Sequence, residues 1–312
     1  MPRGATKIPD LTTGIFCLSE WSRPVITIVM GFATSLVYGF ADFFGALSSK
    51  KIKPILVTLF SGLSGLGFLM LMSPIFGLPA NQTAIFWGVL AGLGSAVAIT
   101  TLYASLAIGP ISILSPLGAV MSALIPMGYA AIVKGEQFTA VGWLALVGIL
   151  VAVVLVGFIP GEDVRLPSLK GLLLGITAGS FIGFILICIN QAPTNSGLTS
   201  VTVMRGVSAT TIGLFILVSW IAKRNFQKTD FVAPRKTWAT IALTGVLDSS
   251  ANVFFLIAMR YGSLTVVSVL TALYPLGTLI LARLVLKEKI AKIQLAGVLL
   301  ALSCSALLAS GL

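Results

Sequence analysis

Residues 236–259, KTWATIALTGVLDSSANVFFLIAM, form an apolar stretch with one acidic residue, Asp248, near its centre. At a rise of ~1.5 Å per residue, a helix of this length crosses a hydrocarbon core of roughly 30 Å. An Asp at the centre of such a helix costs roughly 2.5–3.5 kcal/mol on the insertion scale. A membrane protein tolerates that cost where the carboxylate meets a ligand, an ion, a proton or a partner side chain. The stretch therefore predicts a membrane-spanning helix with a candidate polar site.

The rest of the chain has the same character. Of its 312 residues 57% are hydrophobic and only 9% are charged, whereas a soluble domain carries about 25% charged residues. We expect an all-α polytopic membrane protein with ten transmembrane helices. Their approximate ranges are 26–48, 54–76, 84–107, 110–133, 140–160, 169–190, 199–222, 236–259, 264–286 and 292–310.

The charged and reactive residues exclude several functions. The net charge of +11 comes from Lys and Arg in short loops between spans, where they are expected to face anionic lipid and not nucleic acid. The chain has no His, and its three Cys are isolated. A His-based catalytic triad, a His metal site and a His proton relay are therefore excluded, and we expect no cofactor and no enzymatic activity.

Residues 1–25 differ from the rest of the chain, because they are polar apart from a short apolar patch at 14–18. That patch is too short for the core of a signal peptide. We interpret the segment as an extramembrane tail, or as a start-site artefact with initiation near Met30.

The chain also repeats itself. Gly62 and Ser64 recur as Gly206 and Ser208 at an offset of 144, and Gly109 recurs as Gly262 at an offset of 153. The order of these matches predicts two five-helix repeats, 26–160 and 169–310. A unit with an odd number of spans inserts its copy upside down, so the repeats are expected to be inverted, with a site between them near the midplane.

Loop charges predict the orientation. Six Lys and Arg lie on the side of the termini and fourteen lie on the other side. The positive-inside rule then places the basic loops, with Lys50, Lys228 and Lys289, in the cytoplasm and both termini outside.

Two acidic residues are candidate binding groups for a substrate or a proton. Asp248 lies near the midplane and Asn252 follows one helical turn later, on the same face. Asp42 lies about 7 Å off centre, by a rise of ~1.5 Å per residue, with Tyr38 one turn before it. The alternative for these residues is an interhelical hydrogen bond that only holds the bundle together.

Arg205 lies six or seven residues into the span 199–222. It could neutralise Asp42 or Asp248, bind an anionic substrate group, or extend to the nearer interface. The repeat equivalents of Asp42 and Asp248 are Leu186 and Ser95, so each acid belongs to one half only. The glycines at every fourth position of span 169–190 predict a packing face: Gly171, Gly175, Gly179 and Gly183.

Several short motifs together resemble the EamA family of the drug/metabolite transporter superfamily. They are Tyr38-Gly39-Phe40-Ala41-Asp42-Phe43, Leu102-Tyr103-Ala104, Gly109-Pro110-Ile111-Ser112, Gly135-Glu136, Asp248 to Asn252, Tyr261-Gly262-Ser263, Tyr274-Pro275 and Lys287-Glu288-Lys289. The resemblance covers the chain from Val29 onward. It implies ten helices in two inverted halves and secondary transport of small metabolites, often export. Family members are commonly drawn with both termini in the cytoplasm, opposite to the orientation that the loop charges favour.

We therefore expect a multi-pass plasma (inner) membrane transporter that exports small organic metabolites, amino acids or drugs among them, by alternating access. Its partners would be a small-molecule substrate and the lipid bilayer, with protons as a further candidate, and it would act as a monomer or homodimer. The alternative is a non-transporting membrane scaffold or receptor. The identity of the substrate does not follow from the residues.

Overall fold

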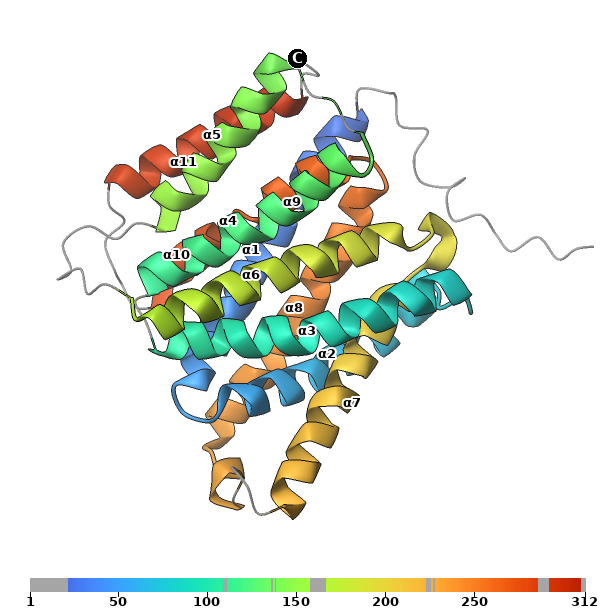
Figure 1. Cartoon of the computed structure of the whole chain (residues 1–312), viewed down its shortest axis with the longest axis vertical. Coiled ribbons are helices and arrows are strands. Elements are labelled where there is room, and N and C mark those ends of the chain that lie inside the picture. Colours follow the sequence, from blue (N-terminus) through green and yellow to red (C-terminus); the bar gives the residue numbers. More distant parts are fainter. Residues whose placement is uncertain are drawn as a thin grey trace, which may run out of the picture.

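The computed structural model describes residues 22–108, 111–135, 137, 139–157, 167–222, 226, 228–285 and 292–309. Within these ranges the chain is helical and contains no strand (Figure 1). The α-helices are α1 (Ser22–Ser49), α2 (Pro54–Phe76), α3 (Gln82–Ile108), α4 (Ile111–Ile132), α5 (Ala140–Gly157), α6 (Leu169–Gln191), α7 (Thr199–Ile221), α8 (Arg235–Met259), α9 (Leu264–Thr271), α10 (Pro275–Val285) and α11 (Lys292–Ala309). Two short 3₁₀ helices, η1 (Thr194–Ser196) and η2 (Lys228–Phe231), flank α7.

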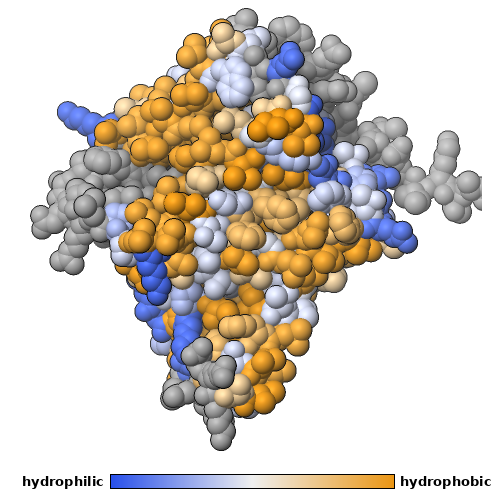
Figure 2. Space-filling view, in the orientation of Figure 1, coloured by the Kyte–Doolittle hydropathy of each residue, from blue (hydrophilic) through white to orange (hydrophobic). Residues whose placement is uncertain are grey.

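Six of these helices are long and apolar enough to cross a membrane: α1, from Pro24, and α2, α3, α6, α7 and α8. Shorter apolar helices cover Leu117–Ile132, Ala140–Leu155 and Leu264–Thr278. The outer surface is apolar, with Leu71, Leu144, Leu173 and Leu214 all exposed. Figure 2 shows this as a broad hydrophobic area on the viewed face, with hydrophilic residues toward its edges. The protein is therefore an integral membrane protein, whereas the count of ten spans stays a prediction.

The span expected at 264–286 is interrupted in the structure. α9 ends at Thr271 and α10 begins at Pro275. Pro275 has no N–H to donate and its ring crowds the carbonyl four residues earlier, which favours a kink or a break at this position. The backbone instead makes tighter bonds: the N–H of Tyr274 donates to the carbonyl of Thr271 at 3.1 Å. The side chain of Tyr274 is thereby presented at a helix break inside the bundle.

The helices pack in a pattern that is nearly unchanged when the two halves of the chain are exchanged. α3 packs on α6 and α7, and α8 packs on α1 and α2. α4 packs on α6, while the interrupted pair α9 and α10 packs on α1. α2 meets α7 and α5 meets α11; Figure 1 shows the second pair at one margin of the bundle.

Helix ends gather on two opposite faces. On the first, which we name the Lys50 face, α1 ends and α2 begins, and Lys53 forms an ion pair with Asp230 of η2 at 2.7 Å. On the second, the Gly77 face, α2 ends and α7 begins, and the N–H of Leu198 donates to the carbonyl of Gly77 at 3.0 Å. The loops holding Lys50 and Lys228 thus share a face, while Lys289 lies outside the described residues.

The glycine stripe of α6 is a packing face, as predicted. An added Cβ at Gly179 would overlap the backbone of Gly118 on α4, and one at Gly183 would crowd Ile125 of the same helix. At Gly175 the nearest atom, Oγ of Ser105, would lie at 3.4 Å. The stripe therefore lets α6 approach α4 closely, and most closely at Gly179.

Candidate functional site

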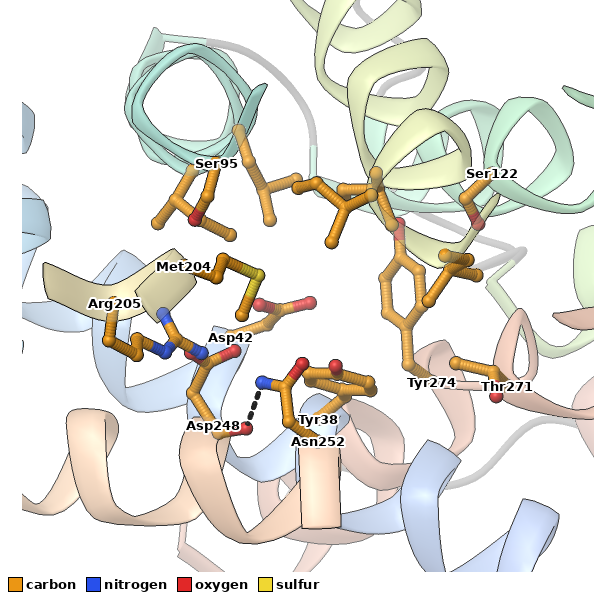
Figure 3. A pocket seen from close by; sticks show the side chains of 15 residues that line it. Tyr38, Asp42, Ser95, Ser122, Met204, Arg205, Asp248, Asn252, Thr271 and Tyr274 are labelled. Carbon is orange, nitrogen blue, oxygen red and sulfur yellow. Dashed lines mark hydrogen bonds and ion pairs between the residues drawn. The ribbon is translucent and has the colours of Figure 1, made fainter. Parts of the chain in front are cut away.

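A small cavity of about 40 Å³ lies between the helices in the middle of the bundle (Figure 3). A buried water needs roughly 10–15 Å³ by this measure, so the cavity holds only a few waters. Its walls come from α1, α3, α4, α6, α7, α8, α9 and the break before α10. The lining residues are Tyr38, Asp42, Ser95, Ile99, Leu102, Ser122, Ile182, Ile185, Leu186, Met204, Arg205, Asp248, Asn252, Thr271 and Tyr274. All five site residues expected from the sequence are among them.

Arg205 and Asp248 form an ion pair at the wall of this central cavity. Both are buried, with Arg205 5% and Asp248 8% exposed. Of the partners that the sequence left open for Arg205, the structure therefore selects Asp248 and not Asp42. Burying two charges costs several kcal/mol each, which only close pairing offsets. The Nε of Arg205 is buried and has no hydrogen-bond partner among the described residues, so one donor of the guanidinium is left over.

Asn252 lies one turn beyond Asp248 on α8, as the spacing predicted. Its Nδ2 donates to the backbone carbonyl of Asp248 at 2.8 Å, the bond drawn in Figure 3. Its Oδ1 is buried and accepts no hydrogen bond within the described part of the chain. A buried unsatisfied acceptor costs about 1–3 kcal/mol, which makes this oxygen available to a ligand or a water.

Asp42 enters the cavity from α1, together with Tyr38. In Figure 3 its carboxylate points into the open space between the Arg205–Asp248 pair and Tyr274. It forms no ion pair or hydrogen bond with any residue in the ranges that the structure describes. The two acids thus differ, because Asp248 is neutralised by a neighbour and Asp42 is not.

Sequence reasoning missed several polar wall residues. Tyr274 lies at the helix break, and its hydroxyl donates to the carbonyl of Ser115 at 3.2 Å. The signal for it was the Tyr274-Pro275 pair, since Pro predicts an interruption. Ser122 and Thr271 carry no such signal. Ser95 and Leu186, which are the repeat equivalents of the two acids, line the same cavity.

The site offers little to a metal ion. Among the described residues no group of three or more His, Cys, Asp and Glu side chains could hold one. What the cavity can do chemically is bind polar groups, through one cationic donor, one free carboxylate, an amide and several hydroxyls.

Comparisons with known proteins find a family likeness for the second half of the chain. Residues 169–310 match the model of the EamA-like transporter family. A search of curated proteins found no match. A solved structure described only as "Crystal structure of protein" aligns with a TM-score of 0.68 and 15% identity, covering 90% of this chain and 96% of that one. This likeness concerns the fold alone. The resemblance drawn from the short motifs is thus confirmed over residues 169–310, where the chain is similar to the EamA-like transporter family.

Proposed function

We propose that this protein is a secondary transporter of small organic metabolites that works by alternating access between two inverted five-helix repeats. The observation that carries the proposal is the charged cavity: a buried Arg205–Asp248 pair and a free Asp42 face one space among apolar helices. Members of the EamA-like transporter family transport small molecules, and we expect the substrate to bind to these residues. On family grounds we expect export across the plasma (inner) membrane, with no enzymatic role.

The unsatisfied polar atoms support a binding role over a purely structural one. An ion pair that only held the bundle together would need no free donor or acceptor beside it. Here the Nε of Arg205 and the Oδ1 of Asn252 are both left over at the cavity. A ligand that carries a hydrogen-bond acceptor and a donor, as amino acids and many drugs do, satisfies both groups.

The packing pattern supports inverted repeats. α3 packs on α6 and α7. When the two halves are exchanged, this packing corresponds to that of α8 on α1 and α2, which also occurs. Close glycine contacts follow the same rule: Gly92 of α3 meets the backbone of Met204 on α7, while Gly245 of α8 meets the backbone of Ser61 on α2. Inverted repeats of this kind allow one half to rock against the other around a fixed central site.

The size of the cavity indicates that a metabolite does not fit into the site in this conformation. Pockets that bind small molecules measure about 300–1,000 Å³, whereas this cavity measures about 40 Å³. A metabolite enters only after the helices separate, which is what alternating access requires. A static scaffold or receptor, the alternative function, has no need of a central charged cavity that must open.

The proposal can be tested on the purified protein. A thermal-shift screen across metabolite classes identifies ligands, and uptake or efflux of each ligand is then measured in proteoliposomes. Arg205→Gln is expected to abolish both stabilisation by the ligand and transport. Gly206→Ala is the matched control, since a Cβ there meets no atom within 4 Å. If no ligand stabilises the wild type and nothing crosses the membrane, the scaffold alternative replaces this proposal.

A further inference from the structure

Asp42 lies between two cavities. Besides the central cavity it lines a second one of about 80 Å³, together with Ala46 one turn later on α1 and Lys50 just after the end of that helix. The other walls of the second cavity are Phe43, Leu47, Leu106, Ser115 and Thr278. Lys50 is exposed at the end of α1, so this cavity runs from Asp42 toward the Lys50 face. Its volume admits several waters, at roughly 10–15 Å³ each, but no organic substrate.

At the opposite end of the bundle the described residues line a separate cavity. A third cavity of about 50 Å³ lies at the Gly77 face, between the ends of α6 and α8, and is lined in part by Asn190, Leu256 and Arg260. It shares no lining residue with the central cavity. By the repeat offset of 144, Asn190 is the equivalent of Ala46. The equivalent of Asp42 is Leu186, an apolar residue, and among the described residues it is Asp42 that lines both the central and the second cavity.

The groups around Asp42 leave its charge uncompensated. The titratable or charged side chains nearby are Tyr38 on α1, Lys50 just after α1, Tyr103 on α3, Arg205 on α7, Asp248 on α8, and Tyr274 before α10. Arg205 forms its ion pair with Asp248. Lys50 lies two helical turns from Asp42, at the other end of the second cavity. The central cavity thus carries one net negative charge whenever Asp42 is ionised.

We propose that Asp42, and not Asp248, is the group that binds and releases a proton during the transport cycle. The proton enters and leaves through the second cavity, from the Lys50 face. A hydronium ion in that cavity gives its proton to a carboxylate oxygen of Asp42 and leaves as water; the reverse step restores the carboxylate. In this conformation water reaches Asp42 through the second cavity, which is too small for an organic substrate. This inference rests on the proposed function and names its coupling residue.

Infrared difference spectroscopy of the purified protein tests the assignment without any substrate. The wild type is titrated with acid and base, and the carbonyl stretch of a protonated carboxyl group is followed in H₂O and D₂O. The band is expected to persist in the double variant Arg205→Met with Asp248→Leu, which removes both charges of the ion pair, to vanish in Asp42→Asn and to return, shifted, in Asp42→Glu. A band lost in the folded double variant, or no titrating band in the folded wild type, overturns the proposal. Because no transport is measured, the result is independent of the proposed function.

The route is tested with a pair of equivalent cysteines. Ala46→Cys and Asn190→Cys are each placed in a background without Cys17, Cys188 and Cys304, and right-side-out and inside-out vesicles are treated with Ag⁺, a thiol-reactive ion small enough for a cavity that admits only waters. Ala46→Cys is expected to react only from the Lys50 face and Asn190→Cys only from the Gly77 face. In addition, Ala46→Leu should slow deuterium exchange of the Asp42 band by at least about tenfold, whereas Asn190→Leu should not. Labelling of Ala46→Cys from the Gly77 face, or equal exchange in both leucine variants, overturns the route.

Discussion

At the scale of single residues, Asp42 and Asp248 differ in whether a neighbouring side chain compensates their charge. Sequence position alone favoured Asp248, because it lies nearest the midplane. The structure pairs it with Arg205, so its charge is already compensated. Asp42 lacks a partner in the described residues and faces two cavities. The residue with the less central position is thus the one that is free to change its charge.

The ion pair changes what is expected of Asp248→Asn. The substitution leaves the Arg205 guanidinium buried without a counter-charge, which costs about 3–5 kcal/mol. We therefore expect a lower unfolding temperature in detergent as well as lost transport.

The double variant Arg205→Met with Asp248→Leu separates the two effects. It removes both charges at similar volume, so it should recover most of the stability while transport stays absent. Recovery of transport in the double variant would show that the pair is only structural.

A second residue-scale prediction concerns Tyr274. Tyr274→Phe removes the hydroxyl that donates to the Ser115 carbonyl, and we expect a loss of about 0.5–1.5 kcal/mol in unfolding free energy. Thermal unfolding of purified protein measures it. A loss of transport much greater than the loss of stability would instead assign the hydroxyl to substrate binding.

At the scale of the elements, small residues decide how closely the helices approach. In lipid no hydrophobic force draws helices together, so close packing of backbones is the main attraction between them. The stripe on α6 provides such a surface for α4, and Gly88 and Gly92 of α3 provide one for α7. The break at Pro275 is the other element-scale feature, because it brings Tyr274 into the cavity wall.

Two glycines of the stripe should respond differently to the same change. At Gly179 an added Cβ overlaps the Gly118 backbone, which cannot give way, while at Gly175 the closest atom lies at 3.4 Å. Gly179→Ala should destabilise the protein by about 1–3 kcal/mol, the usual cost of overpacking, and Gly175→Ala by much less. Unfolding temperatures of the two variants in the same detergent measure the difference. Equal values would mean that α6 and α4 separate easily.

At the scale of the whole molecule, the two halves of the chain meet on both sides of the central cavity. On the Lys50 face Lys53 joins the start of α2 to Asp230 of η2, and its ammonium also lies 4.8 Å from the ring centroid of Phe226. On the Gly77 face the loop after α2 bonds to the start of α7. In the proposed transport cycle, rocking of the halves would break one of these two sets of contacts and keep the other.

The arrangement of faces can be checked in cells. Lys50→Cys and Lys228→Cys, in a cysteine-free background, should be labelled by an impermeant thiol reagent from one side, and Arg260→Cys from the other. Whichever side proves cytoplasmic then decides between the orientation favoured by loop charges and the one drawn for the family. Labelling of Lys50→Cys and Arg260→Cys from the same side would contradict the arrangement.

The sequence by itself determined the helical membrane class, the approximate positions of the helices apart from the break between Thr271 and Pro275, the packing role of the α6 glycines and five of the polar residues that line the central cavity. These features can be read from the sequence because they are local. The bilayer sets the length of an apolar span, and a charge inside it is costly and therefore rare. Only the tertiary structure decided that Arg205 pairs with Asp248, that Tyr274 joins the wall and that Asp42 connects two cavities. These facts depend on distances between helices far apart in the chain, which no local pattern encodes.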